Sequence, residues 1–189
     1  MKANTIMKNG YSLIEMLIIL MIISIFSTII IIDYSKQKSS NDLAFAVKQV
    51  IEDMRAVQNN TVNTLKYDGS VPLGGYGVKF STSSNTSYVL FADSNANRLY
   101  DPGTDGLVRT ATLPRGIVLD SVETNLPSSA DAAVVFTPPY GVIYINEKNA
   151  SNNSGVTVVL TLQIKKGSAV CPSTDCKTLE FTSEGKISK

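Results

Sequence analysis

An uninterrupted apolar run near the N-terminus constrains this chain more than any other feature. From Tyr11 to Ile32 the run reads YSLIEMLIILMIISIFSTIIII, and its one charged side chain is Glu15. As a helix this segment would be about 33 Å long, enough to cross the hydrocarbon core of a membrane. Because Lys2 and Lys8 precede it, the positive-inside tendency predicts a cytoplasmic N-terminus and a remainder outside the cytoplasm.

Glu15 separates this run from a plain signal anchor, which explains the apolar residues and the basic flank but not the acid. A carboxylate inside a membrane span costs about 3 kcal/mol on insertion scales, and such groups usually face a partner. The run itself contains no basic residue. Cleavage after Gly10 would create a free amine on Tyr11. In low dielectric the Glu15 carboxylate of one chain would then pair with the amine of a neighbouring chain.

The residues at this junction, KNGYSLIEMLI, resemble the class III signal of type IV prepilins and type II secretion pseudopilins. In that family a membrane-bound prepilin peptidase cleaves after the glycine and N-methylates the new terminus. The resemblance implies a cleaved leader at residues 1–10, recognition of Gly10, N-methylation of Tyr11 and an assembly role for Glu15. Tyr11 departs from the usual Phe at this position but keeps an aromatic ring.

The same resemblance implies where the chain resides and what it meets. It predicts a single pass through the bacterial inner membrane at residues 11–32, followed by transfer into a pilus or pseudopilus fibre. The expected partners are other pilin or pseudopilin subunits, the prepilin peptidase and an inner-membrane assembly platform, with membrane lipid around the helix before assembly. Type IV pilus, type II secretion and competence systems share such leaders, so the choice among them stays open.

Residues 33–65 are expected to form an amphipathic continuation of the helix. Apolar residues recur there at steps of three and four: Leu43, Val47, Val50, Met54, Val57, Thr61 and Leu65. This face is expected to pack on a sheet, with the charged residues Lys48, Glu52, Asp53 and Arg55 mostly elsewhere on the helix surface. The polar stretch 33–41 is weakly helical and is expected to hold a bend or a melted turn.

From residue 66 to residue 189 the period changes to two, which predicts a β-rich globular domain. Strands are expected at 75–81, 87–93, 106–113, 116–122, 132–138, 141–146, 156–165 and 177–183. In the seventh, Val156, Val158, Leu160, Leu162 and Ile164 share one face. The predicted fold class is α+β, with a long N-terminal helix packed against an antiparallel β-rich domain of one or two sheets.

Three phrases within this region, LPRGIVLDS, VVFTPPYGVIYI and TSEGKISK, resemble the FimT/GspH type of minor pilins. The resemblance implies two packed sheets against the C-terminal half of the helix. It also implies a minor subunit that acts in priming or at the tip of a fibre. A different minor or major pilin remains the alternative.

Two cysteines, Cys171 and Cys176, stand in CPSTDC near the C-terminus. The spacing does not fit a CxxC redox pair, and the chain has no other Cys and no His to complete a zinc site. A short-loop disulfide fits an exported chain, whereas two unpaired thiols would fit a reducing cytosol.

The stretch ADSNANRLYDPGTDGLVR carries oxygen ligands at alternating positions. Asp93, Asn95, Asn97, Asp101 and Asp105 partly match an oxygen-ligand calcium loop. However, Arg98 stands where that loop needs Gly, and Thr104 stands where it needs a bidentate Glu. Asp, Asn and Gly are also ordinary turn formers. A structured hairpin connection is the favoured interpretation, with calcium as the alternative cofactor.

Two other functions compete with assembly. Some FimT-like minor pilins bind DNA for uptake through a basic C-terminal tail. The tail GKISK offers Lys186 and Lys189 but no arginine, which alone gives bidentate phosphate contacts. The net charge of +1 also argues against general binding of polyanions. An enzyme is not expected, because the chain lacks His and no motif places a nucleophile beside a base.

Overall fold

The computed structural model describes residues 12–126, 131–149, 151–153 and 155–188. Three predicted site residues, Gly10, Tyr11 and Lys189, lie outside the described residues. The backbone contacts divide the chain into two compact units that meet between Ser39 and Ser40. The second unit carries the sheets and is described below by itself.

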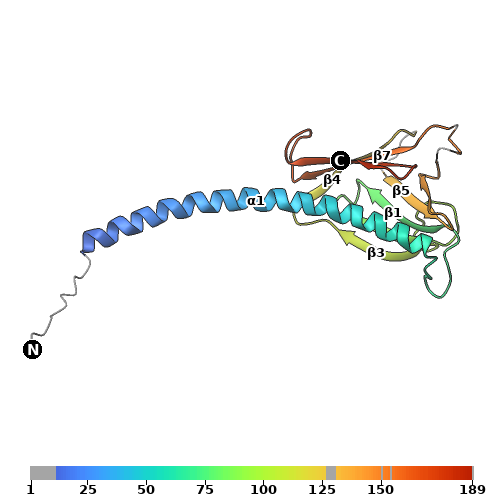
Figure 1. Ribbon diagram of the computed structural model, residues 1–189, viewed down its shortest axis with the longest axis horizontal. Helices are drawn as coiled ribbons and strands as arrows, with labels where there is room; N and C mark the ends of the chain where they lie inside the picture. Colours follow the sequence, from blue (N-terminus) through green and yellow to red (C-terminus); the bar gives the residue numbers. More distant parts are fainter. Residues whose placement is uncertain (1–11, 127–130, 150, 154, 189) are drawn as a thin grey trace, which may run out of the picture. The chain divides into compact units, whose positions relative to one another are not determined.

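One helix and nine strands make up the described fold (Figure 1). The helix is α1, Leu13–Val62. The strands are β1 (Gly75–Ser81), β2 (Ser87–Asp93), β3 (Gly106–Thr112), β4 (Ile117–Thr124), β5 (Asp131–Thr137), β6 (Val142–Ile145), β7 (Val159–Lys166), β8 (Cys176–Thr182) and β9 (Ile187–Ser188). The strand limits predicted from the sequence agree within two residues for seven of the eight expected strands.

The strands form two antiparallel sheets. The first has five strands in the order β3-β2-β1-β5-β6, and the second has four in the order β4-β7-β8-β9. The chain crosses from the first sheet to the second after β3 and again after β6, so each sheet contains strands from separate parts of the sequence. The predicted α+β class is confirmed, with two sheets.

The second half of α1 covers both sheets. Six of the seven positions predicted for the buried face are buried there, as the spacing of three and four predicts: Leu43, Val47, Val50, Met54, Val57 and Thr61. Leu65 is an error in that prediction, because α1 ends at Val62 and the Leu65 side chain is 48% exposed. The melted turn considered for residues 33–41 is also wrong, since the backbone is helical throughout that stretch.

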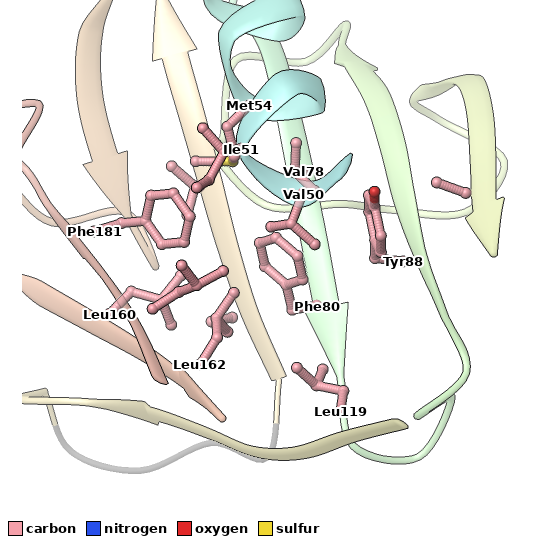
Figure 2. Packing of buried hydrophobic residues seen from close by; sticks show 14 of the residues in the cluster. Val50, Ile51, Met54, Val78, Phe80, Tyr88, Leu119, Leu160, Leu162 and Phe181 are labelled. Atoms are coloured by element: carbon pink, nitrogen blue, oxygen red, sulfur yellow. The ribbon is translucent and has the colours of Figure 1, made fainter. Parts of the chain in front are cut away.

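The core lies where this part of α1 meets both sheets (Figure 2). Val50, Ile51 and Met54 from α1 point toward Val78 and Phe80 from the first sheet and toward Leu160 and Phe181 from the second. Phe80 and Tyr88 stack with ring centroids 5.4 Å apart. Because helix and sheets share one apolar interior, removing any of the three layers would expose it.

Strand β7, the most regular of the strands expected from the sequence, begins three residues later than expected, at Val159. Val156 is 54% exposed and precedes β7, because its N–H donates to the Asn153 carbonyl in a local turn. The rest of the predicted face is confirmed, with Val158, Leu160, Leu162 and Ile164 fully buried. The short strand β9 was not expected. It forms when the chain turns at Gly185 and pairs again with β8.

Candidate functional site: the N-terminal helix and its attachment to the sheets

The first part of α1 exposes an apolar surface on all sides. Every residue from Ser12 to Ser27 is exposed, and most of them are Leu, Ile, Met or Phe. Soluble proteins rarely expose a contiguous apolar surface of this size unless a membrane or another protein covers it. This segment is therefore the strongest candidate for a functional surface in the chain.

Glu15 lies in the first turn of this helix. The Ser12 carbonyl accepts hydrogen bonds from the N–H groups of Glu15 and Met16, at 3.0 and 3.2 Å, and so starts the helical ladder. A carboxylate in the first turn is favoured by the partial positive charge of the helix N-terminus. Within the part of the chain that the structure describes, no ion pair involves Glu15. The Glu15 carboxylate is thus available to a group outside the described residues.

The hydroxyl groups in this helix bond within the helix itself. Ser24 Oγ donates to the Met21 carbonyl and Ser27 Oγ donates to the Ile23 carbonyl, both at 2.8 Å. A polar group that is satisfied inside the helix costs little in an apolar environment. Glu15 is therefore the outlier among the polar side chains of this segment.

Over the described residues, no helix reaches both the length and the mean hydropathy of a membrane span. The interpretation of residues 11–32 as a membrane span rests on the sequence.

A buried acid attaches the second half of α1 to the first sheet. Tyr88 Oη on β2 donates to Asp53 Oδ2 at 2.6 Å, and the Arg109 guanidinium on β3 pairs with Asp53 Oδ1. Next to them, Gln49 Nε2 donates to the Thr112 carbonyl at 3.2 Å. Burial above all, and then the hydrogen bond to Asp53, raise the pKa of Tyr88 well above its ordinary value of 10.0. The phenol therefore stays protonated and continues to donate.

Thr61 joins the end of α1 to the other strands of the same sheet. Its hydroxyl lies 3.1 Å from the Phe136 carbonyl on β5, and the Tyr76 N–H on β1 donates to it at 3.1 Å. Tyr76 Oη in turn donates to the Leu65 carbonyl at 3.0 Å. With Asp53, this places polar contacts between helix and sheet two turns apart along α1, so the helix cannot slide without breaking both sets.

The acidic loop between β2 and β3 covers the face of the first sheet that turns away from α1. Leu99 and Tyr100 pack there on Phe91, Ala133 and Val135, which form a second small core. Phe91 and Tyr100 have ring centroids 5.1 Å apart. The loop therefore completes a second small core on this face of the sheet, a role that the sequence did not indicate.

The predicted calcium ligands of this loop bond to protein donors. Asp105 accepts the N–H groups of Ser94 and Asp101, at 3.0 and 2.8 Å, and Asp101 Oδ2 accepts the amides of Asn95 and Asn97. In the described part of the chain, no group of three or more His, Cys, Asp or Glu side chains is placed to hold a metal ion. These contacts describe a hydrogen-bonded turn, the interpretation favoured from the sequence.

Asp93 is the exceptional member of this loop. Its Oδ2 accepts the Arg98 N–H at 2.9 Å, whereas its Oδ1 is buried without a hydrogen-bond partner. Gly74 packs against it so closely that a Cβ atom on Gly74 would lie 2.0 Å from Asp93 Oδ2. Burial, reinforced by the nearby Asp105 charge, raises the pKa of Asp93.

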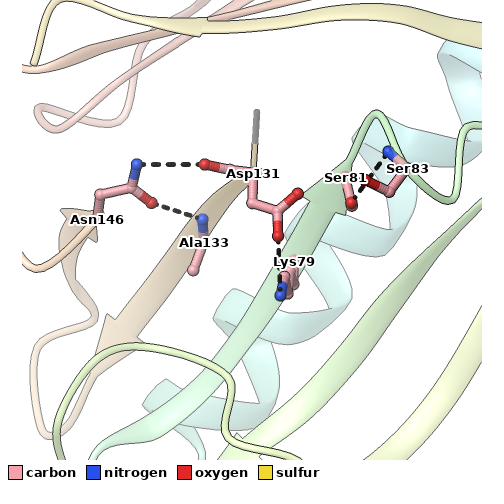
Figure 3. A network of polar contacts seen from close by, with 6 residues as sticks. All are labelled: Lys79, Ser81, Ser83, Asp131, Ala133 and Asn146. Carbon is pink, nitrogen blue, oxygen red and sulfur yellow. Dashed lines mark hydrogen bonds and ion pairs between the residues drawn. The ribbon is translucent and has the colours of Figure 1, made fainter. Parts of the chain in front are cut away.

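A polar network closes the opposite end of this sheet face (Figure 3). Lys79 Nζ on β1 lies 3.1 Å from Asp131 Oδ2 on β5, and the Ala133 N–H donates to Asn146 Oδ1 at 2.9 Å. A hydrogen bond from Ser81, followed by the Lys79 contacts, lowers the pKa of Asp131. The network holds the ends of β1, β5 and β6 together.

The remaining predicted residues lie in the second sheet and its connections. Cys171 and Cys176 form a disulfide, with Cα atoms 5.8 Å apart, that joins the connection after β7 to the first residue of β8. Lys186 follows the turn at Gly185 that leads into β9, and it lines a hollow together with Arg55 of α1. Glu180 and Glu184 stand close by and bond to Ser188 and Thr157. These two acids oppose the lysine charge, so the described tail is a poor polyanion site.

Sequence reasoning missed Asp53, which was expected mostly on the helix surface. The signal was present, because Ala46, Val50, Asp53 and Val57 follow steps of four, three and four, and so place the acid on the buried face. No comparable signal identifies Tyr88 and Arg109 as its partners, since strand order decides which residues meet.

The comparisons with known proteins bear on the N-terminus alone. A family model described as the prokaryotic N-terminal methylation motif matches residues 7–31. This match includes Gly10, Tyr11 and Glu15, and it confirms the resemblance noted in KNGYSLIEMLI. Comparison of the chain with curated proteins and with solved structures finds no match.

Proposed function

We propose that this chain is a structural subunit that assembles through its N-terminal helix into a pilus or pseudopilus fibre. The premise is that the motif at residues 7–31 is typical of type IV pilins and pseudopilins. The observation that carries the proposal is Glu15, a carboxylate in the first turn of a helix that is otherwise apolar and exposed. The chain contributes no reaction of its own, and the chemistry belongs to the peptidase that processes it.

In this proposal the chain has four parts. Residues 1–10 are the leader, which the prepilin peptidase removes. Residues 11–32 span the inner membrane before assembly and pack among other helices afterwards. Residues 33–65 attach the helix to the sheets, and residues 66–189 form the globular domain outside the cytoplasm.

The mechanism follows from the two environments of the helix. Transfer of an apolar helix from lipid to a bundle of similar helices gains little hydrophobic free energy, because both surroundings are apolar. Packing and specific polar contacts must then select the partner. The Glu15 carboxylate meets the amine that cleavage creates on a neighbouring Tyr11, and in low dielectric such a pair is strongly favoured over two unpaired charges.

The two-sheet domain supports a finer assignment to the FimT/GspH type of minor pilin, in which the subunit acts in priming or at the tip of a fibre. The support is the pair of sheets packed on the C-terminal half of α1, as that resemblance implies. The abundance of the chain in sheared fibres tests this assignment, because a minor subunit should be present in far fewer copies than the main one.

The experiment that tests the proposed function is mass analysis of the N-terminus in cells with and without the prepilin peptidase. With the peptidase, we expect a chain that begins at an N-methylated Tyr11. Without it, we expect the chain to retain residues 1–10. Persistence of the intact leader in cells that possess an active peptidase would overturn the proposal.

A further inference from the structure

Phe45 is an exposed aromatic side chain on the second half of α1. It is 61% exposed, whereas the four other phenylalanines of the second unit, Phe80, Phe91, Phe136 and Phe181, are at most 3% exposed. It lies two positions after the buried Leu43, on the side of the helix that faces away from the sheets. Within the described residues, the Phe45 ring belongs to neither hydrophobic core.

A hollow lies at the neighbouring residue, Ala44. It is lined by Ala44 and Val47 of α1 and by Lys177 and Thr178 of β8, around a volume of about 300 Å³. A second hollow on the other flank of Ala44 is lined by Lys48, Ile51 and Glu52, together with Arg55 and Ile187. The short Ala44 side chain thus leaves room on the surface of α1 next to the one protruding Phe.

The proposed function sets which parts of two neighbouring chains meet. Two copies anchored in one membrane by the same apolar segment have residues 44 and 45 at the same distance along the chain from the anchor. A protruding Phe45 on one copy and a hollow at Ala44 on the other are therefore found at the same level.

The charges around the two features are complementary. Asp42 and Lys48 each lie one turn from Phe45 on α1, but Lys48 pairs with Glu52 at 3.6 Å, so the Asp42 carboxylate is the charge that accompanies the protruding ring. Lys177 lies at the rim of the hollow. Insertion of the ring brings this acid toward this base on the other copy.

We propose that two copies of this chain pair in the membrane before assembly, with Phe45 of each copy seated in the Ala44 hollow of the other. The two contacts are equivalent about a two-fold axis, so the pair closes at two copies. The proposal rests on the proposed function, because it requires membrane anchoring of parallel helices. It identifies a partner, a second copy, and the residues that recognise it.

The direct test is cross-linking of full-length chains in cells that contain the peptidase and the assembly platform. Two differently tagged copies both carry Ala44→Cys and keep Phe45, because the two-fold arrangement brings the two Ala44 positions of the pair close together. We expect a short thiol-reactive cross-linker to join the two tags. The matched control pairs Ala44→Cys with Val62→Cys, an exposed position on the same helix about 27 Å further along it. Equal yields in the two pairs, or products only with a different protein, would overturn the proposal.

Two sets of variants separate recognition from misfolding. In the Ala44→Cys background, Phe45→Ala should reduce the cross-linked dimer about tenfold, since a buried phenyl ring is lost from each contact. Asp42→Lys and Lys177→Asp should each reduce it, and the double variant should restore it. Lys166→Asp, an exposed lysine near the same hairpin but outside the hollow, should have no effect. Failure of the double variant to restore the dimer would contradict the charge pairing.

The two proposals can fail independently. Removal of the leader and entry of the wild-type chain into fibres report on the proposed function. Normal processing and entry without an Ala44–Ala44 product would reject the pair alone, whereas an unprocessed chain would reject the proposed function whatever the cross-linking shows. Products larger than a dimer at this contact would reject the closed two-fold arrangement.

Discussion

Asp93 combines complete burial with an oxygen that no donor satisfies. Burial raises the pKa of its carboxyl, so the native state holds this proton to a higher pH than the unfolded state does. A raised native pKa adds stability that is present below the ordinary value of 3.8 and is lost as pH rises through the native pKa. Above the native pKa the fold therefore holds a buried charge, which destabilises it.

The first prediction concerns Asp93→Asn. Because the amide carries no charge and still offers an oxygen to the Arg98 N–H, we expect this variant to be more stable than the wild type at pH 7. The gain should shrink as the pH falls from 7 through the raised native pKa of Asp93, because the wild-type carboxyl then takes up its proton. Urea unfolding of the detergent-solubilised protein across this pH range measures the difference. A difference that does not vary with pH would contradict the assignment.

The second prediction concerns the acid that fixes α1 to the first sheet. Asp53→Ala leaves the Tyr88 hydroxyl and the Arg109 guanidinium without their acceptor, and we expect a loss of about 2 kcal/mol, less than for a fully buried pair because Arg109 is half exposed. Tyr88→Phe removes one donor. The double variant should be less destabilised than the sum of the two by about 1 kcal/mol. Strict additivity in urea unfolding would show that the two groups do not interact.

At the scale of elements, the β7–β8 hairpin carries the disulfide. Ladder pairs run without interruption from Val159↔Thr182 to Lys165↔Cys176, and fully buried side chains such as Leu162 and Leu179 lie within it. The hairpin therefore does not depend on the bridge for its register. Cys171→Ser/Cys176→Ser should keep the fold and lose about 2 kcal/mol, the entropy of closing a short loop. Loss of the cooperative transition would contradict this.

The loop between β2 and β3 gives the fourth prediction. Since its Asp105 and Asp101 carboxylates already accept protein N–H groups, we expect millimolar calcium or a chelator to leave the melting temperature unchanged. By contrast, Tyr100→Ala should destabilise the protein, because the ring packs on Phe91. A rise in melting temperature with calcium would revive the calcium interpretation of Asp93, Asn95, Asn97, Asp101 and Asp105.

Local patterns predicted the elements well and their partners poorly. The steps of three and four found the buried face of α1, and alternation placed Leu160, Leu162 and Ile164 in the core, because both signals reflect burial of one side. The late start of β7 and the extra strand β9 depend on single turns at Asn153 and Gly185, which leave no periodic signal. Thr61 was placed on the correct face, but its contacts with Phe136 and Tyr76 follow from the strand order.

At the scale of the whole molecule, the residues of the proposed function lie near the N-terminus, and the residues that build the two sheets and their core lie in the second unit. The residues to which the proposal gives processing and assembly roles, Gly10, Tyr11 and Glu15, were identified from a short motif, because the motif holds a few residue types at fixed spacing. The exposed Phe45 and the hollow beside Ala44 were not recognised, since no spacing reveals which surface residue the folded sheets leave uncovered.

The account depends on Glu15 as a recognition group between chains rather than a tolerated acid in an apolar helix. The most direct measurement is the fraction of chain recovered in sheared fibres for Glu15→Asp, Glu15→Gln and Glu15→Val, with leader removal and membrane content checked for each. We predict normal processing of all three, partial entry into fibres for Glu15→Asp and almost none for the two uncharged variants. Entry of Glu15→Val at the wild-type level would contradict the account.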